Sequence, residues 1–317
     1  MMSTSSTNST VLIFHEILEH LYKYGGVILI ILGTISSILN IMVFIQSHIR
    51  RFPCAIYFIT RNIFNFFFIY LSLFYMTLVL GYNLFPNASN LNYCHFSIYI
   101  SLLCDILSPF YLLLAAIYRL IETSTNIKLR KKNTLQSAWI LTISTAIFWI
   151  LFHTHALIYS EIVEIKSNQF HCDLKVGLYS TIITYYSLII KGILCPIILL
   201  ILAIKILRNL RHTRHIQPIM MIAPIEIKTS IKAEQITSIL IKDIFIYICF
   251  SLLMSSVLLY ELITQHHVKN FQQQEIEYFF RHLTIFCVSI PFCIGCYTNL
   301  FVSKFFRNEI LKIFSCK

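Results

Sequence analysis

Three ionisable residues lie in long apolar stretches of the sequence, where charges are rare. Arg119 ends one stretch, in LAAIYRLIETS, Asp105 lies within the same stretch, and Lys191 lies in a later one. A charge inside a membrane is costly unless it is paired or functional. Asp105 and Lys191 can therefore pair, together hold a zwitterionic ligand, or each point separately into a hydrated cavity. Arg119 can bind a neighbouring helix or a docked partner, or it can anchor the chain at the lipid headgroups.

No catalytic motif accompanies these charges. The sequence contains no P-loop, no glycine-rich phosphate turn and no H-E-x-x-H zinc motif. His153 and His155 are two residues apart on a predicted helix. They should therefore point to different faces, which argues against a metal site at that pair. We predict that the chain is not an enzyme and has no cofactor or metal centre.

The chain is far more apolar than a soluble domain. Of its 317 residues, 57% are hydrophobic and 12% are charged, whereas soluble domains carry about 25% charged residues. A helix needs about 20 predominantly apolar residues to cross the hydrocarbon layer. Seven such stretches occur: Gly25–Gln46, Ala55–Tyr82, His95–Ile121, Ser137–Tyr159, Val176–Leu207, Ile236–Ile263 and Tyr278–Val302. The sequence predicts an all-α integral membrane protein, a seven-transmembrane helix bundle.

The bundle therefore occupies residues 25–302, between two shorter segments. Residues 1–24 are polar and lack the basic start and apolar core of a cleavable signal peptide. We expect them to form an extracellular N-terminal segment, with the first span as the insertion signal. Residues 303–317 should form a cytoplasmic C-terminal segment.

The distribution of basic residues predicts the orientation. Of the 25 Lys and Arg residues, 19 lie in or beside the loops after spans one, three and five and in the C-terminal tail. Basic loops face the cytosol, so the N-terminus should be extracellular in a multi-pass plasma-membrane protein. The basic residues are scattered over separate loops, which favours contact with anionic lipid and argues against nucleic-acid binding.

Cysteines and glycosylation motifs agree with this orientation. Of the ten cysteines, only Cys94 and Cys172 fall at the predicted outer face. A single pair in an oxidising compartment predicts a disulfide bond, and two unpaired thiols are the alternative. The N-x-S/T motifs at Asn8 and Asn87 fall on the same side, where they are candidate glycosylation sites.

Seven spans, an outer N-terminus and this cysteine placement resemble rhodopsin-like (class A) G-protein-coupled receptors. Cys94 lies 25 residues before Arg119, as in that family, and IYRLIETS resembles its IDRYxxxS segment. The chain looks like a divergent invertebrate orphan receptor. The resemblance implies that Arg119 is the switch for G-protein coupling. Tyr118 replaces the usual acid before it, so Glu234 at the start of span six is the best counter-ion for Arg119, and Glu122 is a lesser one.

Five further residues match core positions of the family. They are Asn40, Asn65, Ser108, Trp149 and Pro196, with Trp139 as a rival for the tryptophan of span four. The family usually has an aspartate where this chain has Asn65, and that aspartate helps to hold a sodium ion. An amide carries no charge, so the resemblance implies weak or absent sodium regulation.

The C-terminal SKFFRNEILKIF resembles the short amphipathic eighth helix of the family. Its large apolar residues can share one face: Phe305, Phe306, Ile310, Ile313 and Phe314. Cys316 follows two residues later and is a candidate for palmitoylation, with a plain exposed thiol as the alternative.

The resemblance implies an extracellular ligand, held between the outer halves of spans three, five, six and seven. Monoamine receptors have an aspartate where this chain has Ser101, so we expect another ligand class. The candidate pocket residues are Ser101, Asp105, Lys191 and Glu261, and mildly acidic outer loops favour a basic peptide.

The expected cytosolic partners are a heterotrimeric G protein and, as a further candidate, arrestin. The family's C-W-x-P of span six and Asn-Pro-x-x-Tyr of span seven are missing, where the chain reads ICFSLLMSS and PFCIGCYTNLF. A receptor-like chain that no longer signals is therefore an alternative. A small-solute transporter or channel, with Asp105, Lys191 and Arg61 along a polar path, is another.

Overall fold

The computed structural model describes residues 3–47, 49–84, 90–124, 128, 134–166, 169–175, 177–216, 224–265 and 267–315. Side chains are described for these residues except 3–10, 163–171 and 212–232. The elements are α1 Ser3–His20, η1 Leu21–Gly26, α2 Val27–Phe44, α3 Pro53–Phe68, η2 Ile69–Leu73, α4 Phe74–Met76, η3 Thr77–Gly81, α5 Leu91–Glu122, α7 Leu135–Phe152, η4 His153–Leu157, β1 Ser160–Lys166, β2 Gln169–Leu174, α8 Leu178–Tyr186, η5 Ser187–Leu194, α9 Cys195–Ile216, α10 Pro224–Thr264, α11 Phe271–Val302 and α12 Lys304–Phe314.

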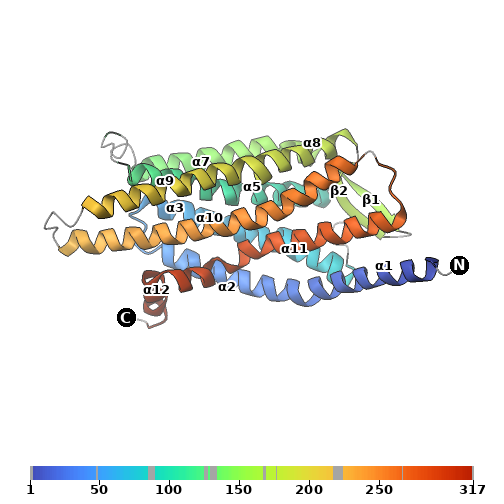
Figure 1. Cartoon of the computed structure of the whole chain (residues 1–317), viewed down its shortest axis with the longest axis horizontal. Coiled ribbons are helices and arrows are strands. Elements are labelled where there is room, and N and C mark those ends of the chain that lie inside the picture. Colours follow the sequence, from blue (N-terminus) through green and yellow to red (C-terminus); the bar gives the residue numbers. More distant parts are fainter. Residues whose placement is uncertain are drawn as a thin grey trace.

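The long helices lie side by side in one bundle (Figure 1). Within the described residues, seven are long and apolar enough to cross a membrane, as the sequence predicted. The N-terminus and the strands β1 and β2 lie at one end of the bundle, called here the hairpin end. The C-terminal helix α12 lies at the opposite end, the α12 end.

The third span, α5, is the centre of the bundle. It contacts α3, α7, α9 and α10, and 56% of its most apolar 18-residue window is buried, against 17% for the fourth span. The fourth span, α7 with η4, therefore lies at the periphery and presents side chains such as Ile140 and Leu151 outward. Large apolar side chains on the outside of a bundle are expected where the surrounding solvent is lipid.

The N-terminal segment is helical and packs on the seventh span. Helix α1 runs through the π-helical η1 into α2 without a break. The rings of Phe14 and Phe279 stack with centroids 4.7 Å apart, and the Tyr22 hydroxyl donates to the carbonyl of His282 at 2.8 Å. Phe14, Leu18 and Tyr22 recur every four residues and so share one helical face. The first span thus extends well beyond the apolar stretch that starts at Gly25.

Gly81 allows the first two spans to touch at the hairpin end. A Cβ atom at this position would lie 2.7 Å from the backbone nitrogen of Lys23 and 2.9 Å from its Cα. We expect Gly81→Ala to push η3 away from η1 and to lower the free energy of unfolding by about 1–3 kcal/mol. Thermal unfolding in lipid nanodiscs would measure the loss.

Gly25→Ala is the matched control for this prediction. There the nearest atom to an added Cβ belongs to the Phe286 ring, at 3.0 Å, and a side chain can move where a backbone cannot. An equal loss in both variants would contradict the role of Gly81.

A two-stranded hairpin covers the hairpin end of α5. β1 and β2 are antiparallel, with Ile162 opposite Cys172. Cys172 forms a disulfide bond with Cys94 at the start of α5, with Cα atoms 5.5 Å apart. The predicted disulfide is confirmed. The hairpin was not predicted, although the alternation in SEIVEIK is a sequence signal for a strand.

The predicted eighth helix is present as α12, turned away from α11 at Ser303. Phe305, Phe306 and Ile310 are buried against the bundle. The last turn differs from the expectation at Phe314, which is 69% exposed, whereas Ile313 still packs against the bundle core. Arg307 donates to the carbonyl of Leu300 at 2.9 Å, which satisfies a terminal carbonyl of α11.

Candidate functional site

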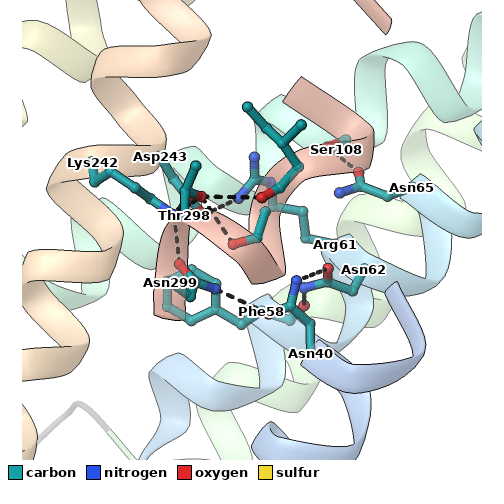
Figure 2. Close-up of polar contacts among 12 residues, drawn as sticks. Asn40, Phe58, Arg61, Asn62, Asn65, Ser108, Lys242, Asp243, Thr298 and Asn299 are labelled. Atoms are coloured by element: carbon teal, nitrogen blue, oxygen red, sulfur yellow. Dashed lines mark hydrogen bonds and ion pairs between the residues drawn. The ribbon is translucent and has the colours of Figure 1, made fainter. Parts of the chain in front are cut away.

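A group of buried and half-buried charges lies in the half of the bundle nearer the α12 end. We call it the Asp243 cluster, and it comprises Arg61, Lys242, Asp243, Thr298 and Asn299. The Asp243 carboxylate on α10 accepts from Arg61 of α3 and lies 2.7 Å from Lys242 Nζ. The same ammonium donates to Thr298 Oγ1 at 2.7 Å and Asn299 Oδ1 at 2.5 Å, both on α11. Figure 2 shows α3 joined to α10 by the Asp243 carboxylate, and α10 joined to α11 by the Lys242 ammonium.

A chain of amides continues from this cluster. Asn299 Nδ2 donates to Asn40 Oδ1 at 3.0 Å, and Asn40 Nδ2 donates to Asn62 Oδ1 at 3.0 Å. Asn62 Nδ2 then donates to the carbonyl of Phe58 at 2.8 Å (Figure 2). Asn40, a predicted core residue, therefore links the first span to the second and seventh.

The sequence alone did not predict this cluster. Arg61 was assigned only to a polar path, and Lys242 and Asp243 were assigned no site. The signal was the pair of opposite charges in ILIKDIFIYI, an otherwise apolar part of span six. Adjacent residues of opposite charge at membrane depth favour mutual pairing and a nearby polar partner.

Three other predicted core residues, Asn65, Ser108 and Trp149, make contacts between helices. Ser108 donates to Asn65 Oδ1 at 2.6 Å, so these two residues form a contact between α5 and α3. Trp149 is 5% exposed and packs edge-on against Phe110, with ring centroids 4.7 Å apart. Its rival Trp139 is 47% exposed, which supports Trp149 as the core tryptophan.

Arg119 is buried at the α12 end of α5. Its guanidinium pairs with Glu122, and its Nε donates to Thr237 Oγ1 of α10 at 2.6 Å. The sequence favoured Glu234 as the counter-ion, and the structure corrects this. Glu122 lies one turn from Arg119 on the same helix, close enough to pair with it. The residue of α10 that contacts Arg119 is Thr237, which lies one turn after Glu234. Tyr118 is buried, with its ring centroid 6.3 Å from that of Tyr57.

Asp105 and Lys191 form the ion pair that the sequence suggested, between α5 and η5. The pair is partly buried, with side chains 28% and 20% exposed. Ser101, one turn earlier on α5, does not join it, and its hydroxyl instead reaches the carbonyl of Leu71 at 3.5 Å. The pair therefore holds the third and fifth spans together at mid-bundle.

The π-helical turn η5 also binds the sixth span through its backbone. Pro196 has no N–H to bond the Gly192 carbonyl, and that carbonyl accepts from the Ser255 hydroxyl at 3.0 Å. The Lys191 carbonyl accepts from Tyr247 at 3.1 Å and from Ser251 at 2.9 Å. Lys191 is thus held by main chain and side chain to two different helices.

The two histidines of span four, which were predicted to point to different faces of a helix, have neighbouring rings. The rings of His153 and His155 have centroids 5.9 Å apart, because this segment, η4, is a tighter 3-10 helix. His153 Nδ1 lies 3.0 Å from the Trp149 carbonyl, and His155 Nδ1 lies 2.7 Å from the Tyr179 hydroxyl. In the described part of the chain, no three potential metal ligands gather together.

Span seven also contains two cysteines at the spacing of a Cys-x-x-Cys motif, which is not among the motifs named above. Cys293 and Cys296 form a Cys-x-x-Cys sequence, and both are buried free thiols. The Cys296 N–H donates to Ser36 Oγ at 2.9 Å. The pair packs α11 against α2.

A cavity of about 730 Å³ opens at the hairpin end, between α1, η3, β2, α10 and α11. Its charged lining residues are Glu19, Asp173, Glu261, Lys269, Glu275, Glu277 and Arg281. Lys269 Nζ lies 2.5 Å from Glu277, and Arg281 Nε lies 3.7 Å from Glu261. Of the predicted pocket residues, Glu261 lines this cavity, whereas Ser101, Asp105 and Lys191 lie elsewhere in the described structure.

The fold and these charged groups define a seven-span membrane protein with a disulfide-bonded hairpin at one end. No protein-family model matches the chain, and comparison with curated proteins finds no match. Three predicted modification sites, the Asn8 side chain, Asn87 and Cys316, lie outside the described residues.

Proposed function

We propose that the chain is a rhodopsin-like G-protein-coupled receptor of the plasma membrane, with its hairpin end extracellular and its α12 end cytosolic. The observation that carries the proposal is Arg119. Its guanidinium is 3% exposed at the α12 end of the central span, held by Glu122 and by Thr237 of α10. The Cys94–Cys172 disulfide and the α12 helix support the same assignment.

In this proposal the chain is a transducer and not an enzyme. A ligand that binds one arrangement of the helices more tightly shifts a pre-existing equilibrium toward it. Movement of α10 breaks the bond from Arg119 to Thr237 and exposes the guanidinium at the cytosolic side. The heterotrimeric G protein binds this exposed face, and arrestin is a second cytosolic partner.

The ligand of this receptor is a basic peptide, in preference to a monoamine. The hairpin-end cavity has a volume within the usual range of ligand sites. Five carboxylates line it, against one lysine, one arginine and two histidines, which favours a cationic ligand. A monoamine receptor would need a carboxylate at Ser101, whose hydroxyl contacts the second span.

Arg119→Ala tests the coupling role directly. We expect basal G-protein signalling in cells to fall by about tenfold or more at equal surface expression, because a hydrogen bond to a charged group contributes about 1.5–3 kcal/mol. Arg51→Ala is the matched control, since Arg51 is an exposed arginine near the same end of the bundle. Equal signals from Arg119→Ala and the wild type would contradict the proposal, and radiotracer flux through vesicles would favour the transporter alternative.

A further inference from the structure

Helix α10 is bonded to several neighbours within three turns near its α12 end. Gln235 Oε1 accepts from the Ser303 hydroxyl at 3.0 Å and from the N–H of Phe305 at 2.5 Å, at the start of α12. Thr237 accepts from Arg119 of α5. Lys242 and Asp243 then reach α11 and α3 through the Asp243 cluster. This stretch therefore fastens α10 to four other elements.

The bonds at Asp243 differ from the others in their charge balance. Among the described residues, Asp243 is the one carboxylate in contact with Arg61 or Lys242, so two cations share one anion. Asp243 is 6% exposed and Arg61 is 9% exposed. Arg61 Nε is buried without a hydrogen-bond partner. The cluster has no spare negative charge with which to replace Asp243.

Separation of α10 from α3 would therefore leave Arg61 behind as an unpaired charge. A lysine can lose its proton in an apolar interior, whereas an arginine stays charged. An uncompensated charge in the interior is strongly unfavourable. The pairing thus favours the arrangement in which Asp243 of α10 reaches Arg61 of α3.

We infer that Arg61, Lys242 and Asp243 form a charge latch that keeps α10 closed against α3 and α11. The latch deepens the proposed function and depends on it in one respect: in that function, the closed position of α10 is the resting state that does not couple to the G protein. The latch is separate from the contacts of Arg119, which join α10 to α5. The movement of α10 would then depend on contacts with the second and seventh spans as well as with the third.

Two variants distinguish a charge latch from a simple set of bonds. Asp243→Asn leaves both cations without an anion while α10 is closed, and opening would let water reach them, so α10 should open. The double variant Arg61→Gln/Asp243→Asn removes one more bonding group but also removes the charge that cannot be neutralised, because Lys242 keeps Thr298 and Asn299 as acceptors. The charge latch predicts that this double variant closes again, whereas a count of lost bonds predicts further opening.

The distance between α3 and α10 reports on the latch without any need for signalling. Spin labels incorporated as non-canonical amino acids at Arg51 and Ser238, which are both exposed, would measure this distance in the full chain in nanodiscs. We expect Asp243→Asn to raise the ratio of long to short distances by at least about tenfold. The double variant should return most of the population to the wild-type distance.

The outcomes separate the latch from the proposed function. Opening in Asp243→Asn that the double variant reverses supports the latch, whether or not G-protein signalling in cells rises in parallel. If the distances change and the signal does not, the proposed function fails and the latch stands. Should Asp243→Asn not fold, recovery of a folded, closed chain in the double variant supports the latch. A double variant as open or as unfolded as Asp243→Asn overturns it.

Discussion

Asp105→Asn is expected to lower the free energy of unfolding by about 3 kcal/mol, the lower end of the range for a broken buried ion pair. The change leaves the Lys191 ammonium without its carboxylate between α5 and η5. The lower end applies because the two side chains retain 28% and 20% exposure, so water offsets part of the loss. Thermal unfolding of the chain in nanodiscs would measure the effect.

The loss of stability in Asp105→Asn should come from the unpaired Lys191 ammonium, and not from the lost hydrogen bond alone. The double variant Asp105→Asn/Lys191→Met removes both charges and is expected to recover most of the stability, since replacing both partners of a buried pair is often neutral. Ser101→Ala, one turn away, removes only a long 3.5 Å hydrogen bond and should change little. If the double variant were less stable than Asp105→Asn, the ion-pair explanation would be wrong.

Loss of the disulfide between α5 and β2 is expected to have a comparable effect. Cys94→Ser/Cys172→Ser opens a loop with a sequence separation of 78 residues, and removal of a native disulfide costs about 2–5 kcal/mol. A long loop places the expected loss in the upper half of that range, because closure entropy grows with loop length. The midpoint of thermal unfolding and the surface expression in cells should both fall.

Replacing both cysteines avoids leaving a reactive thiol that would complicate the result. Cys249→Ser provides the control, because Cys249 is an exposed free cysteine on α10. Its replacement should leave the unfolding midpoint unchanged. An unchanged midpoint in the double cysteine variant as well would show that the hairpin is held by its other contacts, such as the 3.0 Å contact of His95 with the Ser160 carbonyl.

Some side-chain partners were predictable because the sequence offered few choices. Cys94 and Cys172 were the two cysteines at the predicted outer face, and they are bonded. Asp105 and Lys191 were isolated opposite charges in spans three and five, and of the arrangements left open for them the structure shows the ion pair. In such cases the cost of an unpaired group in an apolar region favours pairing.

The partner of Arg119 could not be predicted in this way. Two carboxylates, Glu122 and Glu234, were both plausible partners, and the preference for Glu234 was wrong. The choice depends on how far α10 is shifted along α5, and this shift brings Thr237 to the guanidinium. If α10 moved by one turn along α5, the same apolar residues would still face the bundle. The apolar pattern of the sequence therefore does not indicate the axial position of α10.

Composition along the chain was enough to predict the seven spans and the short amphipathic C-terminal helix. Two cysteines at one predicted face were enough to predict the Cys94–Cys172 disulfide. Three contacts became visible only in the folded chain: Arg61, Lys242 and Asp243 meet, Glu122 holds Arg119, and the N-terminal helix lines a cavity. Each of these contacts depends on the rotation and depth of one helix relative to another, which many different packings of the same apolar stretches would satisfy.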